Sequence, residues 1–152
     1  MNKRDKTIGV NIPRLLGILA TEMLRSRSIA IRELVQNAIG SGAKEVRISL
    51  DRSEDRSNLA VIDNGAGMSE SDIDNYLLRI ASGINPVGQF GMGFFSCMGI
   101  SNEVHVYTRK QGAQALHVVF KVRRSADTCE FEELSCSDLD DGAIAAAGVE
   151  TT

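Results

Sequence analysis

The sequence has no tryptophan, and only 5% of its residues are aromatic. Stacking platforms for the bases of single-stranded nucleic acid are therefore poorly supplied. The three cysteines, Cys97, Cys129 and Cys136, form no Cys-x-x-Cys pair, and their odd number favours reduced thiols over a disulfide framework. No uninterrupted apolar run follows the basic first residues, so neither a signal peptide nor a membrane span is indicated. We expect a cytoplasmic protein.

The chain also has little net charge. Its formal net charge is -3 over 152 residues, and no long basic run stands out. This balance calls for neither a nucleic-acid partner nor an anionic membrane. With 43% hydrophobic residues, the chain is long enough to bury one sizeable core. We expect residues 1–152 to form a single domain.

Hydrophobic periodicity predicts helices early in the chain and strands later. Apolar residues recur at helical spacing over 12–23, and Ser28 is placed to cap a second helix, which Gly40 and Gly42 end. Alternating or continuous apolar runs predict four strands, over 46–51, 59–63, 103–109 and 115–122. Two short helices are predicted over about 72–80 and over 94–100. The segment after 124 carries no clear pattern. The order predicts an α+β fold, a two-layer sandwich in which helices cover one face of a mixed, mainly antiparallel sheet.

The second helix carries a candidate catalytic pair. Glu33 and Asn37 are four residues apart, so they project from the same face of the helix. A carboxylate that polarises water and an amide oxygen that binds a hard cation are what magnesium-assisted phosphoryl transfer requires. Taken alone, such a pair is more often a solvated helix face.

Two glycine-containing segments follow. Asp63 ends an apolar strand and is followed by NGAGM, which places a carboxylate where a buried strand meets a turn. That carboxylate can accept a hydrogen bond from a ligand amino group, although an ordinary Asp-Asn-Gly turn has the same sequence. Further on, Gly88, Gly91 and Gly93 precede an apolar helical run, and free N–H groups at such a helix start form a ready anion site. The spacing matches neither a Walker A loop nor a Rossmann fingerprint.

In this order the three motifs resemble the nucleotide-binding boxes of the GHKL ATPase superfamily, which includes gyrase B, the 90-kDa heat-shock chaperones, MutL and sensor histidine kinases. The runs RELVQNA, DNGAGM, IASG and GQFGMGFFS are most similar to the heat-shock chaperones, and the resemblance covers about residues 29–109. It implies the Bergerat sandwich, with ATP and Mg²⁺ bound between sheet, helices and a mobile lid.

The resemblance also implies a role for individual residues. Glu33 would be the general base that activates the attacking water, and Asn37 would bind Mg²⁺. Asp63 would bind the adenine amino group. Residues that line the adenine pocket or leave room for the base would be Ala38, Gly67 and Met68.

Other contacts would lie along the phosphates and the ribose. Backbone N–H groups that hold the phosphates would come from Gly88, Gln89, Phe90, Gly91, Met92, Gly93 and Phe94. Asn75 or Ser82 would touch ribose or phosphate. The family's closing strand usually carries a threonine that supports the adenine-binding aspartate, and Thr151 or Thr152 would mark its beginning. Only INPV separates Gly83 from Gly88, which is a short lid for this family.

These roles imply binding of Mg-ATP and slow hydrolysis, as the nucleotide switch of a chaperone-like protein that has further domains, client or partner proteins and a dimeric full-length form. We expect this chain to be an N-terminal fragment of such a protein. A nucleotide-gated interaction module without hydrolysis, a histidine-kinase catalytic domain and a MutL-like repair role remain as alternatives. His105 and His117 lie in strand-like segments, and we expect them to be structural or exposed rather than metal ligands.

Overall fold

The computed structural model describes residues 27–78, 93–124 and 129–146. In chain order, the elements are α2 (Arg27–Gly40), β1 (Val46–Arg52), β2 (Ser57–Asp63), α3 (Glu70–Asp72), η1 (Ile73–Leu77), η2 (Phe94–Ser96), α4 (Cys97–Ile100), β3 (Glu103–Thr108), β4 (Leu116–Arg124), β5 (Cys129–Asp138) and α5 (Asp141–Ala146). The predicted helix over 12–23 lies outside the described residues.

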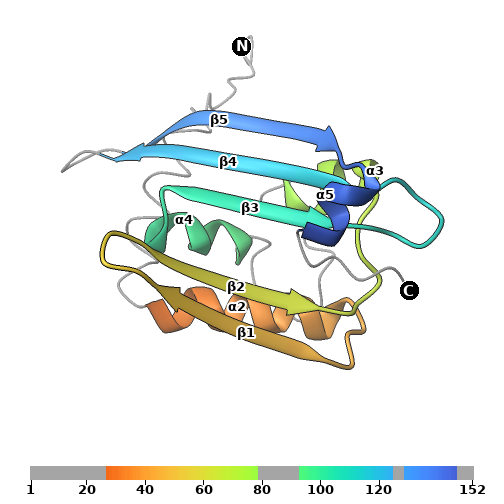
Figure 1. Cartoon of the computed structure of the whole chain (residues 1–152), viewed down its shortest axis with the longest axis horizontal. Coiled ribbons are helices and arrows are strands. Elements are labelled where there is room, and N and C mark those ends of the chain that lie inside the picture. Colours follow the sequence, from red (N-terminus) through yellow and green to blue (C-terminus); the bar gives the residue numbers. More distant parts are fainter. Residues whose placement is uncertain (1–26, 79–92, 125–128, 147–152) are drawn as a thin grey trace, which may run out of the picture.

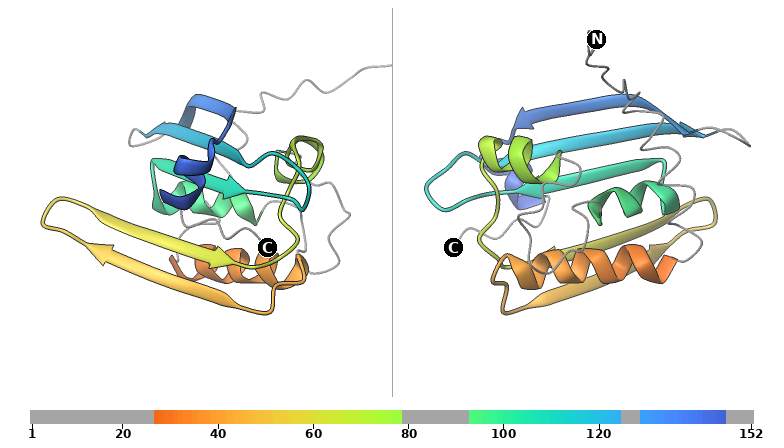
Figure 2. Two further views of the ribbon diagram at one scale, coloured as in Figure 1. Left: turned by 45° about the vertical axis from the view of Figure 1, so that its right-hand side comes forward. Right: turned by 180° about the vertical axis from the view of Figure 1, so that it is seen from behind.

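The strands form two antiparallel sheets that lie side by side (Figure 1). One is the β1–β2 hairpin, and the other has the order β3-β4-β5. Seen from behind, α2, α3 and α4 lie on one face of this strand layer, whereas α5 lies at one end of the opposite face (Figure 2). The predicted α+β class is confirmed, and the helices lie mainly on one face, as the sequence indicates.

Two predicted helix starts differ from the structure. The helix α2 begins at Arg27, so Ser28 lies in its first turn and is not its cap. The helix α3 begins at Glu70, two residues before the predicted start, because Ser69 caps it. The Ser69 hydroxyl and the carboxylate of Asp72 form a capping box, which satisfies the first backbone N–H groups of the helix.

The sequence analysis missed β5 and α5. The register between β4 and β5 shifts at Lys121 and Val122, where Glu133 lies opposite Lys121 and Phe131 lies opposite Val122. This shift leaves Glu132 as an extra residue in β5, so the alternation of apolar and polar residues along the strand is broken. A strand with a bulge does not give the period of two on which the prediction depends.

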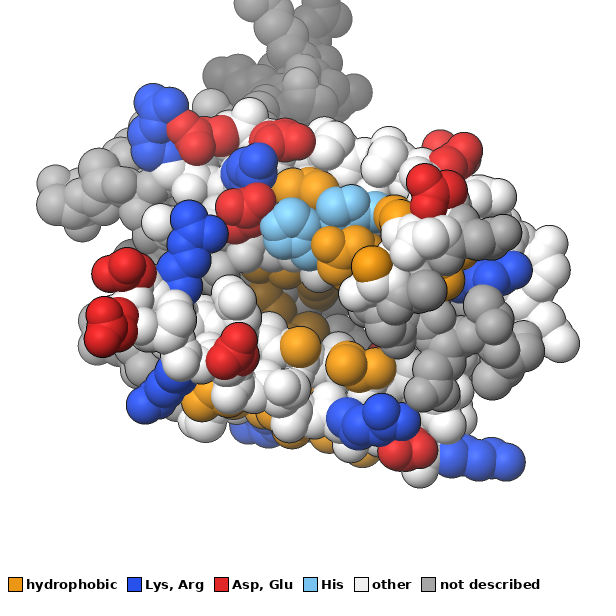
Figure 3. Space-filling view, in the orientation of Figure 1, with side chains coloured by type: hydrophobic (Ala, Val, Ile, Leu, Met, Phe, Trp, Pro, Cys, Tyr) orange, Lys and Arg blue, Asp and Glu red, His pale blue; other side chains and the backbone are white. Residues whose placement is uncertain are grey.

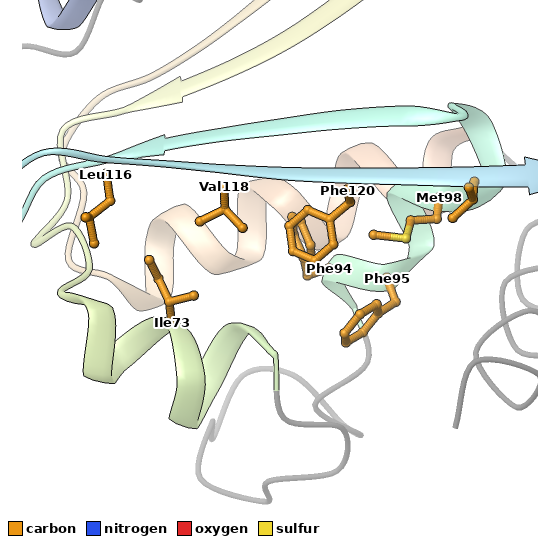
Figure 4. Close-up of a cluster of buried hydrophobic side chains, with 8 residues drawn as sticks. Ile73, Phe94, Phe95, Met98, Leu116, Val118 and Phe120 are labelled. Atoms are coloured by element: carbon orange, nitrogen blue, oxygen red, sulfur yellow. The ribbon is translucent and has the colours of Figure 1, made fainter. Parts of the chain in front are cut away.

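The main core lies between the helices and the inner face of β3–β5 (Figure 4). Its members are the buried side chains of Ile73, Phe94, Phe95, Met98, Leu116, Val118, Phe120 and Val122. The ring centroids of Phe94 and Phe120 are 5.0 Å apart, so the segment that begins η2 is fixed directly onto the sheet. A smaller cluster of Ala115, Leu139 and Ile144 holds α5 against the ends of β4 and β5.

Candidate functional site

One face of α2 carries three polar side chains in a row. Glu33, Asn37 and Ser41 follow one another at intervals of four residues, and Ser41 stands directly after the last helical residue. Four residues are close to one helical turn, so the three side chains lie along one side of the helix over about 12 Å. This row meets the other two motifs at its two ends.

At one end, Glu33 lies against the start of the helical segment after the glycine-rich run. A Cβ atom on Gly93 would lie 2.2 Å from Oε2 of Glu33, so a side chain at this position would force the Glu33 carboxylate to move. The other carboxylate oxygen of Glu33, Oε1, accepts a hydrogen bond of 3.3 Å from Arg32. The Glu33 side chain is 18% exposed to solvent. The structure therefore brings the first motif and the third motif together, although 60 residues separate them in the chain.

At the other end, Ser41 lies against the turn that follows β2. The backbone N–H of Ala66 donates to the carbonyl oxygen of Ser41 at 3.1 Å. The Ser41 hydroxyl donates to the Ala38 carbonyl at 2.8 Å and lies 3.5 Å from Oδ1 of Asp63. A Cβ atom on Gly65 would lie 1.8 Å from Oγ of Ser41, so this glycine lets the turn reach the end of α2.

Asp63 has one oxygen engaged in the turn and one that is available. Its Oδ1 accepts from the N–H of Gly65 at 2.9 Å and lies 3.5 Å from the Ser41 hydroxyl. Within residues 27–78, 93–124 and 129–146, no group donates to Oδ2 of this carboxylate, and the side chain is exposed. The neighbouring Asn64 fixes the turn because its Oδ1 accepts from the N–H groups of Lys44 and Glu45, at 2.9 Å each. The turn thus holds a carboxylate oxygen ready for a donor.

Between the two ends of the row, Asn37 is half-buried and Ala38 is 2% exposed. Among the described residues, no side chain or backbone group bonds to the Asn37 amide. A half-buried amide without a partner can accept a ligand at little cost, because no protein hydrogen bond has to be broken first. Ala38 is small and packed, so it projects no bulk next to this amide.

The end of β3 and the residue after it anchor the glycine turn from the other side. The N–H of Met68 donates to Oγ1 of Thr108 at 2.8 Å, and Thr108 is 7% exposed. Gly67 has a φ of +65°, and a Cβ atom there would lie 1.9 Å from the carbonyl oxygen of Arg109. Gly67 is therefore required both for its backbone conformation and for the close approach of a second chain segment.

An ion pair extends this anchor by one more residue. Lys110 Nζ lies 2.7 Å from Oδ2 of Asp72, the carboxylate that caps α3. The hydrogen bond from Lys110, with further bonds from Ser69, holds the pKa of Asp72 well below its usual range. Three consecutive residues, 108–110, thus contact the turn and the helix that follows it. The sequence analysis assigned no role to Thr108, Lys110 or Ser41, because an isolated polar residue forms no pattern.

The remaining predicted site residues either pack in the core, form hydrogen bonds within their own helical segment, or lie outside the described residues. Met68 is half-buried and packs against the main core. Phe94 is buried in that core, so its side chain serves packing while its backbone begins η2. The Asn75 amide donates to the carbonyl and the hydroxyl of Ser71, at 2.8 and 3.2 Å, within its own helical segment. The predicted residues outside the described part of the chain are Ser82, Gly88, Gln89, Phe90, Gly91, Met92 and Thr151.

The side chains that are present fit a magnesium nucleotide. Asp63 offers Oδ2, to which no described residue donates and which suits an exocyclic amino group, and the Asn37 amide offers an oxygen of the kind that Mg²⁺ prefers. Glu33 supplies a second carboxylate one helical turn from Asn37. Among the described residues, no helix is long and apolar enough to cross a membrane.

Comparison with known proteins also indicates a nucleotide-binding domain. The family model described as "Histidine kinase-, DNA gyrase B-, and HSP90-like ATPase" matches residues 25–142. The chain is 33% identical over 142 residues to the chaperone protein HtpG of Roseobacter denitrificans (strain ATCC 33942 / OCh 114), covering 72% of this chain and 23% of that protein. It is 30% identical over 136 residues to HtpG of Halorhodospira halophila (strain DSM 244 / SL1), covering 68% of this chain and 22% of the relative.

A third HtpG, from Ruthia magnifica subsp. Calyptogena magnifica, is 25% identical over 145 residues, or 74% of this chain and 24% of its own length. The chain thus spans about a quarter of the length of these curated relatives. The family model covers most of the sequence, including α2, the turn after β2 and the segment 108–110. The chain therefore belongs to the family of histidine kinase-, DNA gyrase B- and HSP90-like ATPases, and it is a nucleotide-binding domain of that type.

Proposed function

We propose that this domain binds Mg-ATP along the polar face of α2 and hydrolyses it slowly, as the nucleotide switch of an HtpG-like chaperone. One observation carries the proposal. The helix α2 contacts the turn of Asp63 at one end and Gly93 at the other, and between them lies the Asn37 side chain, which has no hydrogen-bond partner among the described residues. A nucleotide also has two chemically different ends, a base and a phosphate chain, and the motifs that suit them lie at opposite ends of one helix.

At the adenine end, Asp63 selects the base. Its Oδ2 accepts a hydrogen bond from the adenine amino group, while Oδ1 stays bonded to the turn. Because the Gly65 N–H holds Oδ1, the carboxylate is oriented before the ligand arrives. Gly67, Met68 and Ala38 form the surroundings of the base.

At the phosphate end, Glu33 is the general base. Its carboxylate orients a water molecule and accepts a proton from it as the water attacks. Asn37 binds Mg²⁺ through its amide oxygen, and the metal, when bound, neutralises charge on the phosphates. Gly93 has no side chain, so nothing at this position displaces the Glu33 carboxylate.

We propose slow turnover because the lid run between Gly83 and Gly88 consists only of residues 84–87, and a short lid excludes water poorly. The chaperone role, dimerisation of the full-length protein and client proteins are inferred from the name HtpG that the relatives carry.

The proposal is tested by calorimetric titration of the purified chain with ATP and ADP, with and without Mg²⁺. We expect saturable binding, a rise in thermal midpoint because the ligand binds only the native state, and at least a tenfold loss of affinity in Asp63→Asn. Asp51→Asn, an exposed aspartate on β1, is the matched control and should bind as the parent does. Normal affinity in a folded Asp63→Asn variant would refute the adenine assignment.

Two further variants separate hydrolysis from binding. Glu33→Ala should bind ATP within a few-fold of the parent and lower turnover by at least a hundredfold, whereas Asn37→Ala should remove the dependence of binding on Mg²⁺. Binding by the parent without any turnover, also in the longest natural form of the protein, would instead support the nucleotide-gated interaction module. Transfer of phosphate to a histidine of a partner would support the histidine-kinase alternative.

A further inference from the structure

The outer face of the β3–β4 hairpin carries the only two histidines of the chain. Tyr107 lies directly opposite His117, and His105 lies opposite Val119, so the two histidines are diagonal neighbours across the strands. Their side chains point away from the core, which contains the intervening Val118. Both histidines are visible as a pair on the open face of the molecule (Figure 3). In sequence they are twelve residues apart, so the pairing follows from the register alone.

The two imidazole rings are in direct contact. Nδ1 of His105 lies 2.8 Å from Nε2 of His117, and the ring centroids are 5.1 Å apart with an angle of 16° between the planes. The Tyr107 ring lies nearly parallel to that of His117, with centroids 4.3 Å apart and 9° between the planes, and its centroid is 6.2 Å from that of His105. The contact between Nδ1 and Nε2 holds the two histidine nitrogens close together.

A carboxylate orients the first of these rings. Oε1 of Glu103 lies 3.0 Å from Nε2 of His105. An ionised carboxylate only accepts, so Nε2 of His105 carries the proton and Nδ1 presents its lone pair toward His117. A carboxylate on the far nitrogen of an imidazole is the usual arrangement around histidines that bind metals, because it fixes the tautomer and raises the basicity of the free nitrogen.

We propose that His105 and His117 bind a divalent transition-metal ion, such as Ni²⁺, Cu²⁺ or Zn²⁺, between Nδ1 of His105 and Nε2 of His117. A metal–nitrogen bond is about 2.0–2.1 Å long, and two such bonds at angles between 90° and the tetrahedral value place the nitrogens about 2.9–3.4 Å apart. The observed 2.8 Å needs to widen by only a few tenths of an ångström, and each ring has to turn so that its nitrogen lone pair points to the ion instead of to the other ring. The proton on Nε2 of His117 moves to Nδ1 of the same ring, so no proton is lost.

The surroundings suit a dication. Glu103 and Glu133 both interact with His105, and their negative charges offset the positive charge of the metal. Lys121 forms ion pairs with both carboxylates, and its positive charge reduces this effect. The His105 side chain is 38% exposed, which leaves room for water ligands. In the described part of the chain, no group of three or more His, Cys, Asp and Glu side chains could hold a metal ion. The site therefore has two protein ligands, and water completes the coordination.

Two imidazoles favour particular ions. Imidazole nitrogen suits Cu²⁺, Ni²⁺ and Zn²⁺, and among them Cu²⁺ binds most tightly in the Irving–Williams order. Mg²⁺ prefers oxygen ligands, so this site does not compete for the metal of the nucleotide. A metal at this position would join β3 to β4, close to the Thr108 end of β3 that anchors the glycine turn.

The test is a calorimetric titration of the untagged chain with Ni²⁺, in a Cys129→Ser/Cys136→Ser background that removes competing thiols. Cys97 can stay, because burial raises the pKa of its thiol to about 12 and keeps it protonated. We expect one ion per chain, at least a tenfold loss of affinity in His105→Gln and in His117→Gln alike, and a smaller loss in Glu103→Gln. Tyr107→Phe keeps the stacked ring and should bind as the parent does.

The single variants His105→Gln and His117→Gln distinguish binding by both histidines from binding by one exposed histidine, because both variants lose Ni²⁺ affinity only if the ion contacts both rings. If either His→Gln variant binds Ni²⁺ within twofold of the parent, or the double variant still binds, the proposal is wrong. Electron paramagnetic resonance of the Cu²⁺ complex gives a second measurement that needs no variant at the site. Coupling to two imidazole nitrogens is expected, and coupling to one or none overturns the proposal.

Discussion

The two sheets of this domain differ in how well their apolar side chains are covered. In the β3–β5 sheet, Leu116, Val118 and Phe120 are at most 5% exposed. In the β1–β2 hairpin, Ile48 and Leu50 are 51% and 55% exposed, although both strands contribute apolar residues to the same face. The described residues therefore supply a packed core on one side of the domain and a more open surface on the other.

The candidate site lies where these two regions meet. Between β2 and β3 the open face is hollowed, with hydrophobic side chains on its floor (Figure 3), and no hydrogen bonds join the two sheets within the described residues. The glycine turn after β2 connects the regions instead, because Ser41 holds it on the hairpin side and Thr108 and Arg109 hold it on the core side. The core therefore fixes the position of the site, while the less covered hairpin ends in the main candidate binding residue, Asp63.

The difference in burial predicts the largest effect. Leu116→Ala should lower the free energy of unfolding by about 2–5 kcal/mol, because it removes a buried side chain and leaves a cavity. Leu50→Ala removes the same atoms from a side chain that is 55% exposed and should cost less than about 1 kcal/mol. Urea unfolding of both variants measures the difference. Equal losses would mean that the hairpin face is covered as fully as the core, and the contrast between the two sheets would not hold.

Alanine substitutions at two glycines test the contact between the turn after β2 and the end of β3. Gly67→Ala should destabilise the domain by about 2–4 kcal/mol, because the methyl group meets the Arg109 carbonyl and the residue has a positive φ. Gly112 has a φ of +75° with nothing within 4 Å of a Cβ atom, so Gly112→Ala should cost only the backbone term of about 1–2 kcal/mol. The excess loss in Gly67→Ala, measured by thermal unfolding, reports the close approach. Equal costs would show that the turn moves freely away from Arg109.

A smaller effect is expected at the strand end. Thr108→Val keeps the shape of the side chain but leaves the Met68 N–H without its acceptor, which should cost about 1–3 kcal/mol. Thr108→Ser retains the hydroxyl and should be closer to the parent. Because the turn positions Asp63, we also expect nucleotide affinity to fall in Thr108→Val. If Val and Ser variants are equally stable, the hydrogen bond contributes little.

The sequence predicted much of this fold because its elements have regular periods. Four of the five strands and the helix α2 follow from alternation or helical spacing, and the structure confirms them within a few residues. The strand β5 did not, since the bulge at Glu132 breaks its period, and α5 follows in an Ala-rich segment without an amphipathic pattern. Regular elements are visible in a sequence, whereas irregular ones depend on pairing with a partner strand.

The sequence motifs predicted the candidate ligand-binding residues, but they did not predict the contacts that hold these residues in place. Three short motifs in a fixed order identified Glu33, Asp63 and Gly93, and their roles toward ATP stay predictions. The contact between Glu33 and Gly93 depends on how α2 packs, which no local pattern encodes. Thr108 had one readable signal: it is the last residue on the core-facing side of β3, after Val104 and Val106, and a hydroxyl at a buried position needs a partner.

The smallest predicted effect concerns the ion pair that extends the anchor. The pKa of Asp72 is lowered chiefly by the hydrogen bond from Lys110, so the charged carboxylate stabilises the folded state. This contribution is present above the unfolded pKa of about 4 and is lost as the pH falls through the lower folded pKa. Asp72→Asn should therefore lose less stability than the parent between about pH 5 and pH 2, measured by thermal midpoints.

Two controls make this last comparison specific. Lys110→Met removes the main cause of the low pKa and should also reduce the acid sensitivity, whereas Asp74→Asn, at an exposed neighbour on η1, should leave it unchanged. Because the pair lies at the surface, the difference should shrink in high salt, where exposed charges are screened. An acid profile of Asp72→Asn that matches the parent at low salt would mean that Lys110 does not hold the cap, and that the anchor of the turn ends at Arg109.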